Sequence, residues 1–500
     1  MARFDNALGL ALAFSIAGWS GGCAQVHKTT EGRDGAPPSP GAADAASDGT
    51  SSVSDGAADL SIVPDGPAAN RPCVNLECQR VRCAGAPTTV SGTAYAPNGT
   101  LPLYNVIVYV PNAPLEPFKP GISCDRCGVV ASGNPIATAV SNEEGKFKLT
   151  NVPAGKNIPV VFQVGKWRRK VILPNVTPCQ DNLISDSELS RLPRNRGEGD
   201  LPRIAVATGA CDQLGCLLPK IGVDVAELGI PGENKAVAYY QDSAITMPNG
   251  SATFGPANMP GAPMLWNNEA TLSQYDLTLL SCECNEYLQT KSAAALSAMT
   301  GYLRRGGRIF GSHYAYVWLR DSPDPMFATA ATVAPNGPGV PKGPLIVDTT
   351  FPKGKALADW MKFLDPTITY GQIVSDQVFN DVIGVMRPAA QSWATTPTPN
   401  PFGSGGALPS RPRIVTINTP VGVPAEDQCG RAAQLDVHIT ALPTFIPASA
   451  ATTFPGVCGT KLNKGEEALA FLFFDLAACI QDDTKPVVPP IIVEDRSPPP

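Results

Sequence analysis

The sequence predicts a multidomain protein in which a β-sandwich precedes an α/β domain with a doubly wound parallel sheet, between two unstructured ends. Short runs with an apolar residue at every second position occupy the first part of the folded chain. Apolar runs that alternate with helical patterns occupy the rest. The 51 prolines and 47 glycines among 500 residues favour loops, turns and short strands throughout.

The N-terminus has the pattern of a secretory signal. An apolar stretch at 7–17 leads to small residues before Cys23. The Gly-Gly-Cys sequence at this point resembles the lipobox of bacterial lipoproteins, in which the cysteine is acylated after cleavage. The resemblance implies a signal peptide at 1–22 and contact with a membrane through lipid on Cys23. Because Ala24 follows, it also implies an outer-membrane lipoprotein, periplasmic or surface-exposed.

Both ends of the chain have the composition of unfolded segments. Gly, Ala, Pro, Ser and Asp occupy 32 of the 40 positions in 31–70. The few large apolar residues that remain cannot offset the entropy lost when a segment becomes ordered. We therefore expect a lipid-anchored disordered linker at 23–72 and a Pro-rich tail at 483–500. The formal net charge of −6 argues against a nucleic-acid partner.

Cysteine usage indicates an oxidising compartment, where disulfides are the default. Apart from Cys23, the cysteines fall into two groups, six in the first folded region and seven in the second, so that one of the seven is left over. A metal knuckle or redox pair is the alternative for the pair at 124 and 127, but the sequence contains no second CxxC motif. The disulfide candidates are Cys73, Cys78, Cys83, Cys124, Cys127, Cys179, Cys211, Cys216, Cys429, Cys458 and Cys479.

The first folded region, 73–180 with a Cys-rich entry, shows about seven short strands with turn signals between them. Its motifs are VSGTAY at 90–95, LYNVIVYV at 103–110, ATAVSNEEGKF at 137–147, VPAG at 152–155 and GKWRR at 165–169. These motifs resemble the carboxypeptidase regulatory-like, transthyretin-related β-sandwich over 88–178. That resemblance implies a spacer or adhesive module without catalysis.

The second folded region, 200–482, alternates strands with helices and carries a Pro/Gly-rich insertion at 321–412. Strands are expected at 203–208, 236–240, 276–282, 308–313, 413–417 and 431–438, and helices at 212–221, near 296–303, at 356–363 and from 464. The motifs YDLTLL at 275–280, LRRGGRIFGSH at 303–313 and GEEALAFLFFDL at 465–476 resemble the class I glutamine-amidotransferase-like fold, which is flavodoxin-like, and within it the trehalose-utilisation (ThuA-like) group.

Histidine is the informative residue, because the chain has three: His27 in the linker, His313 and His438. The last two stand at the carboxyl ends of expected strands, where open α/β sheets place their sites, so their rings are expected within about 10 Å of each other. Cys282 and Glu283 also follow a strand directly. A cysteine beside an imidazole can act as a nucleophile. The alternative is that Cys282 forms a disulfide. In amidotransferases glycines flank the nucleophilic cysteine in a tight turn, whereas no glycine flanks Cys282.

Two further site hypotheses remain open. The two histidines with Glu283 or Asp436 have the donors of a zinc site, although two structural histidines explain the pattern equally well. Tyr314, Tyr316 and Trp318 are candidates for a sugar-stacking surface or for core aromatics. The sequence requires no cofactor.

Two functions are therefore compatible with the sequence. The first is a cell-envelope lipoprotein acting as a non-catalytic or weakly catalytic binding module for glycan or an envelope protein. The second is a hydrolase, active on carbohydrates or amides, with its site at the carboxyl edge of the α/β sheet.

Overall fold

The computed structural model describes most of the two folded regions. The described residues are 72–242, 254–335, 343–375, 377–398, 408–438 and 453–492. The expected signal peptide, Cys23, His27, nearly all of the linker and the last residues of the tail lie outside them. Residues 70–500 form one compact unit. Among the described residues, no helix combines the length and the apolar character needed to cross a bilayer.

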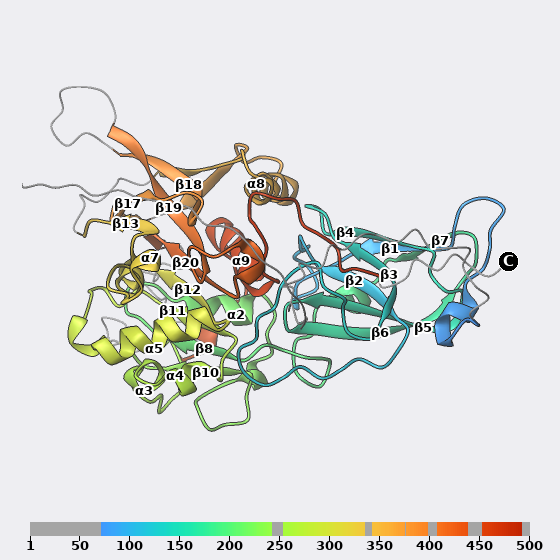
Figure 1. Cartoon of the computed structure of the whole chain (residues 1–500), viewed down its shortest axis with the longest axis horizontal. Coiled ribbons are helices and arrows are strands. Elements are labelled where there is room, and N and C mark those ends of the chain that lie inside the picture. Colours follow the sequence, from blue (N-terminus) through green and yellow to red (C-terminus); the bar gives the residue numbers. More distant parts are fainter. Residues whose placement is uncertain are drawn as a thin grey trace, which may run out of the picture. The chain divides into compact units, whose positions relative to one another are not determined.

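The first folded region consists of two sheets that pack against each other (Figure 1). One sheet has the order β4-β1-β7, and the other has the order β3-β2-β5-β6. In β4 the apolar residues Phe147 and Leu149 are buried and their neighbours exposed, as the alternation of side chains along a strand requires. The ring of Phe147 meets Phe162 of the opposite sheet edge-on at 5.5 Å. The strands are β1 (Thr89–Thr93), β2 (Ile107–Pro111), β3 (Pro135–Val140), β4 (Lys146–Thr150), β5 (Gly155–Val164), β6 (Trp167–Val176) and β7 (Asp181–Ile184).

The second region is built on a ten-stranded sheet in the order β15-β14-β18-β19-β20-β12-β11-β8-β10-β9. From β20 to β9 the neighbouring strands are parallel. From β15 to β20 they are antiparallel. The strands are β8 (Ile204–Ala207), β9 (Leu228–Gly229), β10 (Val237–Tyr240), β11 (Leu277–Leu280), β12 (Arg308–Ser312), β14 (Gly343–Val347), β15 (Gln372–Ser375), β18 (Ala390–Thr398), β19 (Leu408–Thr419) and β20 (Gly430–Leu435).

The expectation of a parallel sheet throughout is therefore wrong, because the sheet is mixed. The segment 321–412, expected as an insertion, supplies β14, β15, β18 and the start of β19. Only residues 420–429 connect β19 to β20, too short a link for the helical crossover that parallel neighbours need, so the two strands pair antiparallel. Two smaller pairs complete the region: β13 (Ala331–Val333) with β17 (Val382–Val385), and β16 (Gln377–Val378) with β21 (Val437–His438).

Helices cover both faces of the large sheet. Phe310 of β12 packs on Phe473 of α9 (Lys464–Ala477), whereas its neighbour Ile309 belongs to the cluster that contains α5 (Ala293–Arg304). Asn463 caps α9, and Glu466 bonds back to the Asn463 backbone, which fixes the helix start where the sequence places it. The shorter helices are η1 (Asn75–Gln79), α1 (Ser187–Ser190), η2 (Leu214–Cys216), α2 (Leu217–Lys220), η3 (Val225–Glu227), α3 (Pro263–Trp266), α4 (Glu269–Leu272), η4 (Leu288–Thr290), η5 (His313–Tyr316), α6 (Val317–Arg320), α7 (Pro325–Ala328), η6 (Ala425–Asp427) and η7 (Gly456–Cys458).

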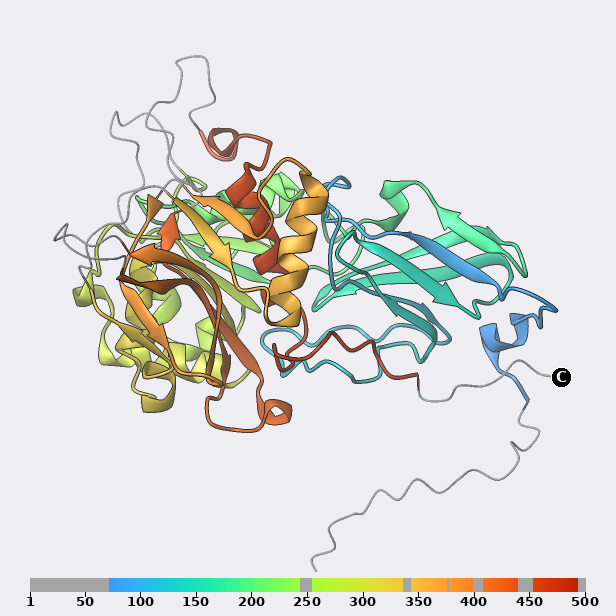
Figure 2. The ribbon, with the colours of Figure 1, turned by 90° about the horizontal axis from the view of Figure 1, so that it is seen from above.

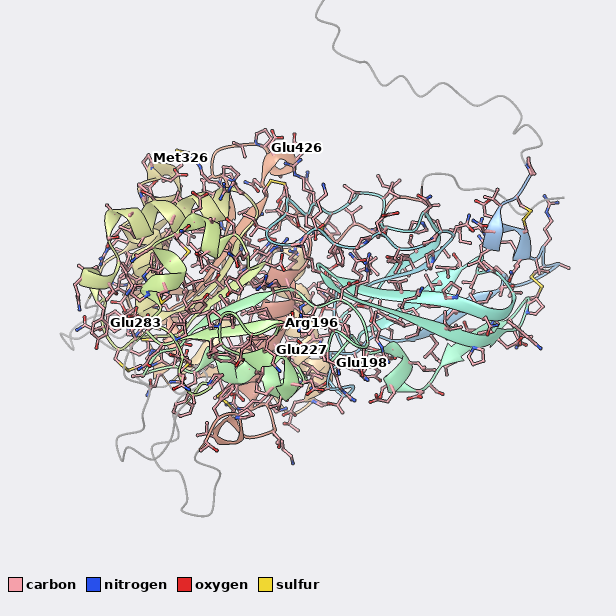
Figure 3. The ribbon with its side chains drawn as sticks, turned by 90° about the horizontal axis from the view of Figure 1, so that it is seen from below. Arg196, Glu198, Glu227, Glu283, Met326 and Glu426 are labelled. Atoms are coloured by element: carbon pink, nitrogen blue, oxygen red, sulfur yellow. A yellow bond between two sulfur atoms is a disulfide. The ribbon has the colours of Figure 1, made fainter. Side chains whose placement is uncertain are left out.

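The two regions share one hydrophobic cluster. Figure 2 shows α8 (Pro352–Leu364), in orange, between the large sheet and the sandwich, where Trp360 donates a hydrogen bond to the carbonyl of Pro102 at 2.8 Å. The segment that joins the regions is tied to the second one, because Arg196 lies against Glu227 (Figure 3) at an Nε–Oε2 distance of 2.9 Å. The two regions are therefore packed together by contacts that are far apart in the sequence.

Disulfides add to this packing, and they correct the expected grouping of cysteines. The pairs are Cys73–Cys78, Cys83–Cys179, Cys124–Cys429, Cys127–Cys479, Cys211–Cys284 and Cys216–Cys458. The third and fourth pairs join the sandwich to the α/β region, so the two groups are not closed sets. The CxxC motif forms neither a metal knuckle nor a redox pair, because each of its cysteines bonds to a distant partner.

The start of the tail also differs from expectation. Asp483 is buried and forms ion pairs with Arg431 and Lys353, so it belongs to the fold. Asp483 is held in the fold by buried partners, of which Arg431, the nearer in the sequence, precedes it by 52 residues. The composition of the tail itself contains no signal of such distant partners.

Candidate functional site

Three adjacent strands bring three metal-ligating or nucleophilic side chains to one edge of the sheet. Cys282 follows β11, His313 follows β12, and His438 ends β21, directly after β20. Since β11, β12 and β20 are parallel neighbours, their carboxyl ends meet at this edge. His313 and His438 do lie together, as their positions in the sequence predict, with ring centroids 5.0 Å apart.

The backbone at His313 turns sharply from strand to helix. Its φ is 43°, in the left-handed region that residues other than glycine rarely adopt. Gly311 permits the turn, because a Cβ at that position would lie 2.7 Å from Cβ of Ala315. In α/β-hydrolases a strained strand-to-helix turn of this kind presents the catalytic residue. Here the residue at the turn is a histidine.

The cluster is centred on the His313 ring. Its Nδ1 lies 3.2 Å from His438 Nε2 and 3.5 Å from Cys282 Sγ. Its Nε2 lies 3.0 Å from Asp381 Oδ2. On the other side, Nδ1 of His438 lies 2.6 Å from Oε1 of Gln377. All ring nitrogens of the two histidines therefore have polar neighbours.

An aromatic ring fixes the orientation of both imidazoles. Phe379 stacks on His313, with ring centroids 3.5 Å apart and an interplanar angle of 12°, and also contacts the His438 ring. Phe379, Gln377 and Asp381 all come from the segment expected as an insertion. The sequence reasoning missed them, and the only local signal is the cluster of polar residues around 375–381.

Burial sets the protonation of the cluster. Cys282 is fully buried, and His313 and His438 are 4% and 3% exposed. Burial lowers the pKa of His313, against the opposite effect of Asp381. Burial and the neighbouring His313 lower the pKa of His438 to about 3, so both rings are neutral near pH 7. Burial raises the pKa of Cys282 to about 12, so that thiol is protonated, which opposes a free thiolate nucleophile.

The remaining predicted residues lie at different distances from the cluster. Asp436 lies close to His313. One carboxylate oxygen of Asp436, one carboxylate oxygen of Asp381 and one ring nitrogen of His313 all lie within 4.8 Å of one another. Asp436 also pairs with Arg413 at 3.3 Å, and burial raises its pKa to about 7. Cys284 forms a disulfide with Cys211, whereas Cys282 is the free cysteine of the described residues.

Glu283 does not belong to the cluster, so its expected pairing with the histidines is wrong. Its carboxylate (Figure 3) forms an ion pair with the buried ammonium of Lys291. Burial and a hydrogen bond with Glu283 raise the pKa of Asp242 to about 9. Cys282 and Glu283 are consecutive, yet the Cys282 sulfur lies beside the His313 ring whereas the Glu283 carboxylate lies against Lys291.

Two of the three candidate stacking aromatics are interior residues. Trp318 packs edge-on against Trp266, with centroids 5.1 Å apart, and is 5% exposed. Tyr316 is 1% exposed and donates a hydrogen bond to Glu286 at 2.8 Å. Tyr314 is partly exposed and lies beside the His313 ring, with centroids 4.1 Å apart. A stacking surface made by all three is therefore not present.

Comparisons with known proteins give little further information. No family model matches the chain, and no curated protein matches it. Among solved structures, a ThuA-like protein of Bacteroides uniformis has 11% identity and a TM-score of 0.30, covering 54% of this chain and 90% of its own. A type II cohesin–X-dockerin complex of Acetivibrio cellulolyticus has 19% identity and a TM-score of 0.14, covering 23% and 67%. A second such complex has 13% identity and a TM-score of 0.16, covering 30% and 88%. The functional assignment therefore depends on the geometry of the cluster.

Proposed function

We propose that this protein is an exported hydrolase whose reaction centre is the cluster of Cys282, His313 and His438. The observation that supports it is the convergence of these side chains from three adjacent strand ends on a strained strand-to-helix turn. Buried polar clusters of this kind contribute less to stability than apolar packing, and backbone strain concentrates at functional sites. Asp381 behind His313 adds the carboxylate that orients an imidazole for reaction.

The fold we propose is the class I glutamine-amidotransferase-like, flavodoxin-like fold of the ThuA-like group, extended by the antiparallel strands. The chain departs from the amidotransferase pattern at the turn itself, where His313 stands in place of a cysteine. Together with the complete burial of Cys282, this favours water over the thiol as the nucleophile. The bond cleaved would be an amide or a glycosidic bond of an envelope polymer.

The location follows from the cysteines. Six disulfides indicate an extracellular or periplasmic protein. We propose further that lipid on Cys23 anchors the chain to the outer membrane, that 23–72 gives it reach, and that the sandwich is a regulatory-like spacer module. Glycan in the envelope is then the polymer within reach of the site.

The lipid anchor predicts that labelled palmitate is incorporated into the wild-type chain in cells and that Cys23→Ala abolishes the labelling. The acyl group needs the Cys23 thiol and amine after signal cleavage, so no other residue can replace it. The measurement is fluorography of the immunoprecipitated protein, with Cys282→Ala as the matched cysteine control. Equal labelling of Cys23→Ala and the control contradicts the anchor.

The hydrolase proposal predicts that His438→Ala lowers the rate of bond cleavage at least about 100-fold, the size expected for a group that acts on the reacting atoms. The measurement is product release from purified peptidoglycan, scored separately for new amino groups and new reducing ends. His27→Ala is the matched control, because it removes the chain's remaining histidine. Equal rates in the two variants reject the site. Binding without release by the wild type rejects hydrolysis and favours a glycan-binding module.

A further inference from the structure

We propose that Cys282 Sγ, His313 Nδ1 and His438 Nε2 bind one divalent transition-metal ion, and that Zn²⁺ fits them best. The proposal rests on the same cluster as the hydrolase and deepens it by naming the cofactor. It also makes a claim about binding that is measurable without any substrate.

The distances between the three atoms match those between ligands of one tetrahedral ion. Zn–N bonds of about 2.0–2.1 Å and a Zn–S bond of about 2.3 Å place two nitrogens about 3.4 Å apart and nitrogen and sulfur about 3.6 Å apart. The corresponding separations here are 3.2 Å between the histidine nitrogens and 3.5 Å between His313 Nδ1 and Cys282 Sγ. The three donor atoms all lie within 4.8 Å of one another.

The hydrogen bonds on the far sides of the rings direct the lone pairs inward. Asp381 Oδ2 and Gln377 Oε1 are acceptors, so His313 Nε2 and His438 Nδ1 carry the ring protons. With the ring protons on these outer nitrogens, the two facing nitrogens, 3.2 Å apart, are left as acceptors with lone pairs. The Cys282 thiol has one proton and can donate it to only one of them. A metal ion satisfies both lone pairs and the sulfur at once.

The same two acceptors form the outer layer of a metal site. Histidine ligands of metals usually donate their other ring N–H to a carboxylate or carbonyl, which fixes the tautomer and raises ligand basicity. Asp381 and Gln377 occupy these positions, and Phe379 holds both rings in orientation. A pair of histidines with a purely structural role does not require this arrangement on both rings.

The donor set selects the kind of ion and the kind of reaction. Thiolate and imidazole suit zinc and disfavour Ca²⁺ and Mg²⁺, which take oxygen ligands. Three protein ligands leave the fourth position for water, as in catalytic zinc sites. That water would lose a proton and form a C–O bond at a carbonyl carbon, while the C–N bond breaks and the proton passes to the leaving nitrogen. Glycosidases generally use two carboxylates instead, so this cofactor favours an amide substrate.

Cobalt binding tests the proposal directly. The full-length protein is produced in an oxidising compartment without a polyhistidine tag, stripped with dipicolinic acid and titrated with Co²⁺ or Zn²⁺. We expect one ion per chain and, with Co²⁺, a thiolate-to-metal charge-transfer band together with the visible bands of a tetrahedral ion. Cys282→Ser should lose the charge-transfer band, and His438→Ala should bind at least about 100-fold more weakly, while His27→Ala behaves as the wild type.

A second set of variants covers the case in which the ligand variants do not fold, as judged by near-ultraviolet circular dichroism. Asp381→Asn and Gln377→Ala keep all three ligands and should weaken binding about 10- to 100-fold. Absence of stoichiometric binding by the wild type, or an unchanged charge-transfer band in Cys282→Ser, overturns the proposal. Metal binding without bond cleavage supports the metal site and rejects the hydrolase. Bond cleavage that survives chelation supports the hydrolase and rejects the metal ion as its cofactor.

Discussion

Replacing Arg431 with alanine is expected to lower the free energy of unfolding by about 3–5 kcal/mol, the usual cost of removing one partner from a buried ion pair. Arg431 contacts Asp475 at 2.9 Å and Asp483 at 2.8 Å, and Lys353 contacts the same two carboxylates. All four side chains are buried. The network holds two positive and two negative groups, so removal of Arg431 leaves two buried carboxylates facing one ammonium.

The measurement is urea unfolding without reductant, followed by tryptophan fluorescence. Arg305→Ala is the matched control, because Arg305 pairs with Glu269 at 2.6 Å but is 56% exposed. An exposed pair contributes less than about 1 kcal/mol, since solvent screens it. If the two variants lose similar amounts of stability, the buried network does not hold the tail and α9 in place as the structure implies.

Parts of the fold that depend on local patterns could be predicted from the sequence. The alternation in β4, the capped start of α9 and the strand before His313 each carry their signal within a few residues. The proximity of His313 and His438 could also be predicted, although 125 residues separate them. It depends on His313 following β12 and His438 standing three residues beyond β20, since β12 and β20 are parallel neighbours whose carboxyl ends share an edge.

Features that depend on long-range pairing could not be predicted. The antiparallel half of the sheet, the two disulfides that join the regions and the burial of Asp483 have no signal near the residues involved. The same holds for half of the site. Asp381, Gln377 and Phe379 reach the histidines because β16 pairs with β21, and a two-residue strand is below what periodicity can detect.

The choice between two neighbouring candidate residues could not be predicted either. Cys282 and Glu283 both follow β11 directly, and the sequence does not indicate which of the two side chains faces the histidines. The structure resolves it through Lys291, whose buried ammonium neutralises Glu283 and leaves Cys282 on the side of the histidines.

Removing the Cys127–Cys479 disulfide, as Cys127→Ala/Cys479→Ala, is expected to destabilise the protein by about 4 kcal/mol. The disulfide spans 352 residues, but Cys124–Cys429 already closes most of that loop. With that bond intact, the remaining loop is about 50 residues, for which the chain-entropy relation gives about 4 kcal/mol. Replacement of both cysteines avoids a new free thiol.

The Cys73→Ala/Cys78→Ala variant is the matched control, because its disulfide spans 5 residues and should contribute only about 2 kcal/mol in the same relation. Both variants are unfolded in urea without reductant, and the chain-entropy relation predicts that the long-range variant loses about 2 kcal/mol more stability than the control. The sandwich loop that carries Cys127 meets the α/β region next to the end of α9, where the Cys127 N–H donates to the carbonyl of Ile480 at 3.0 Å. Loss of the long-range bond therefore also loosens this contact, which moves the measured value further from the control. Equal destabilisation of the two variants would show that the regions stay docked in the unfolded ensemble or that packing alone holds them together.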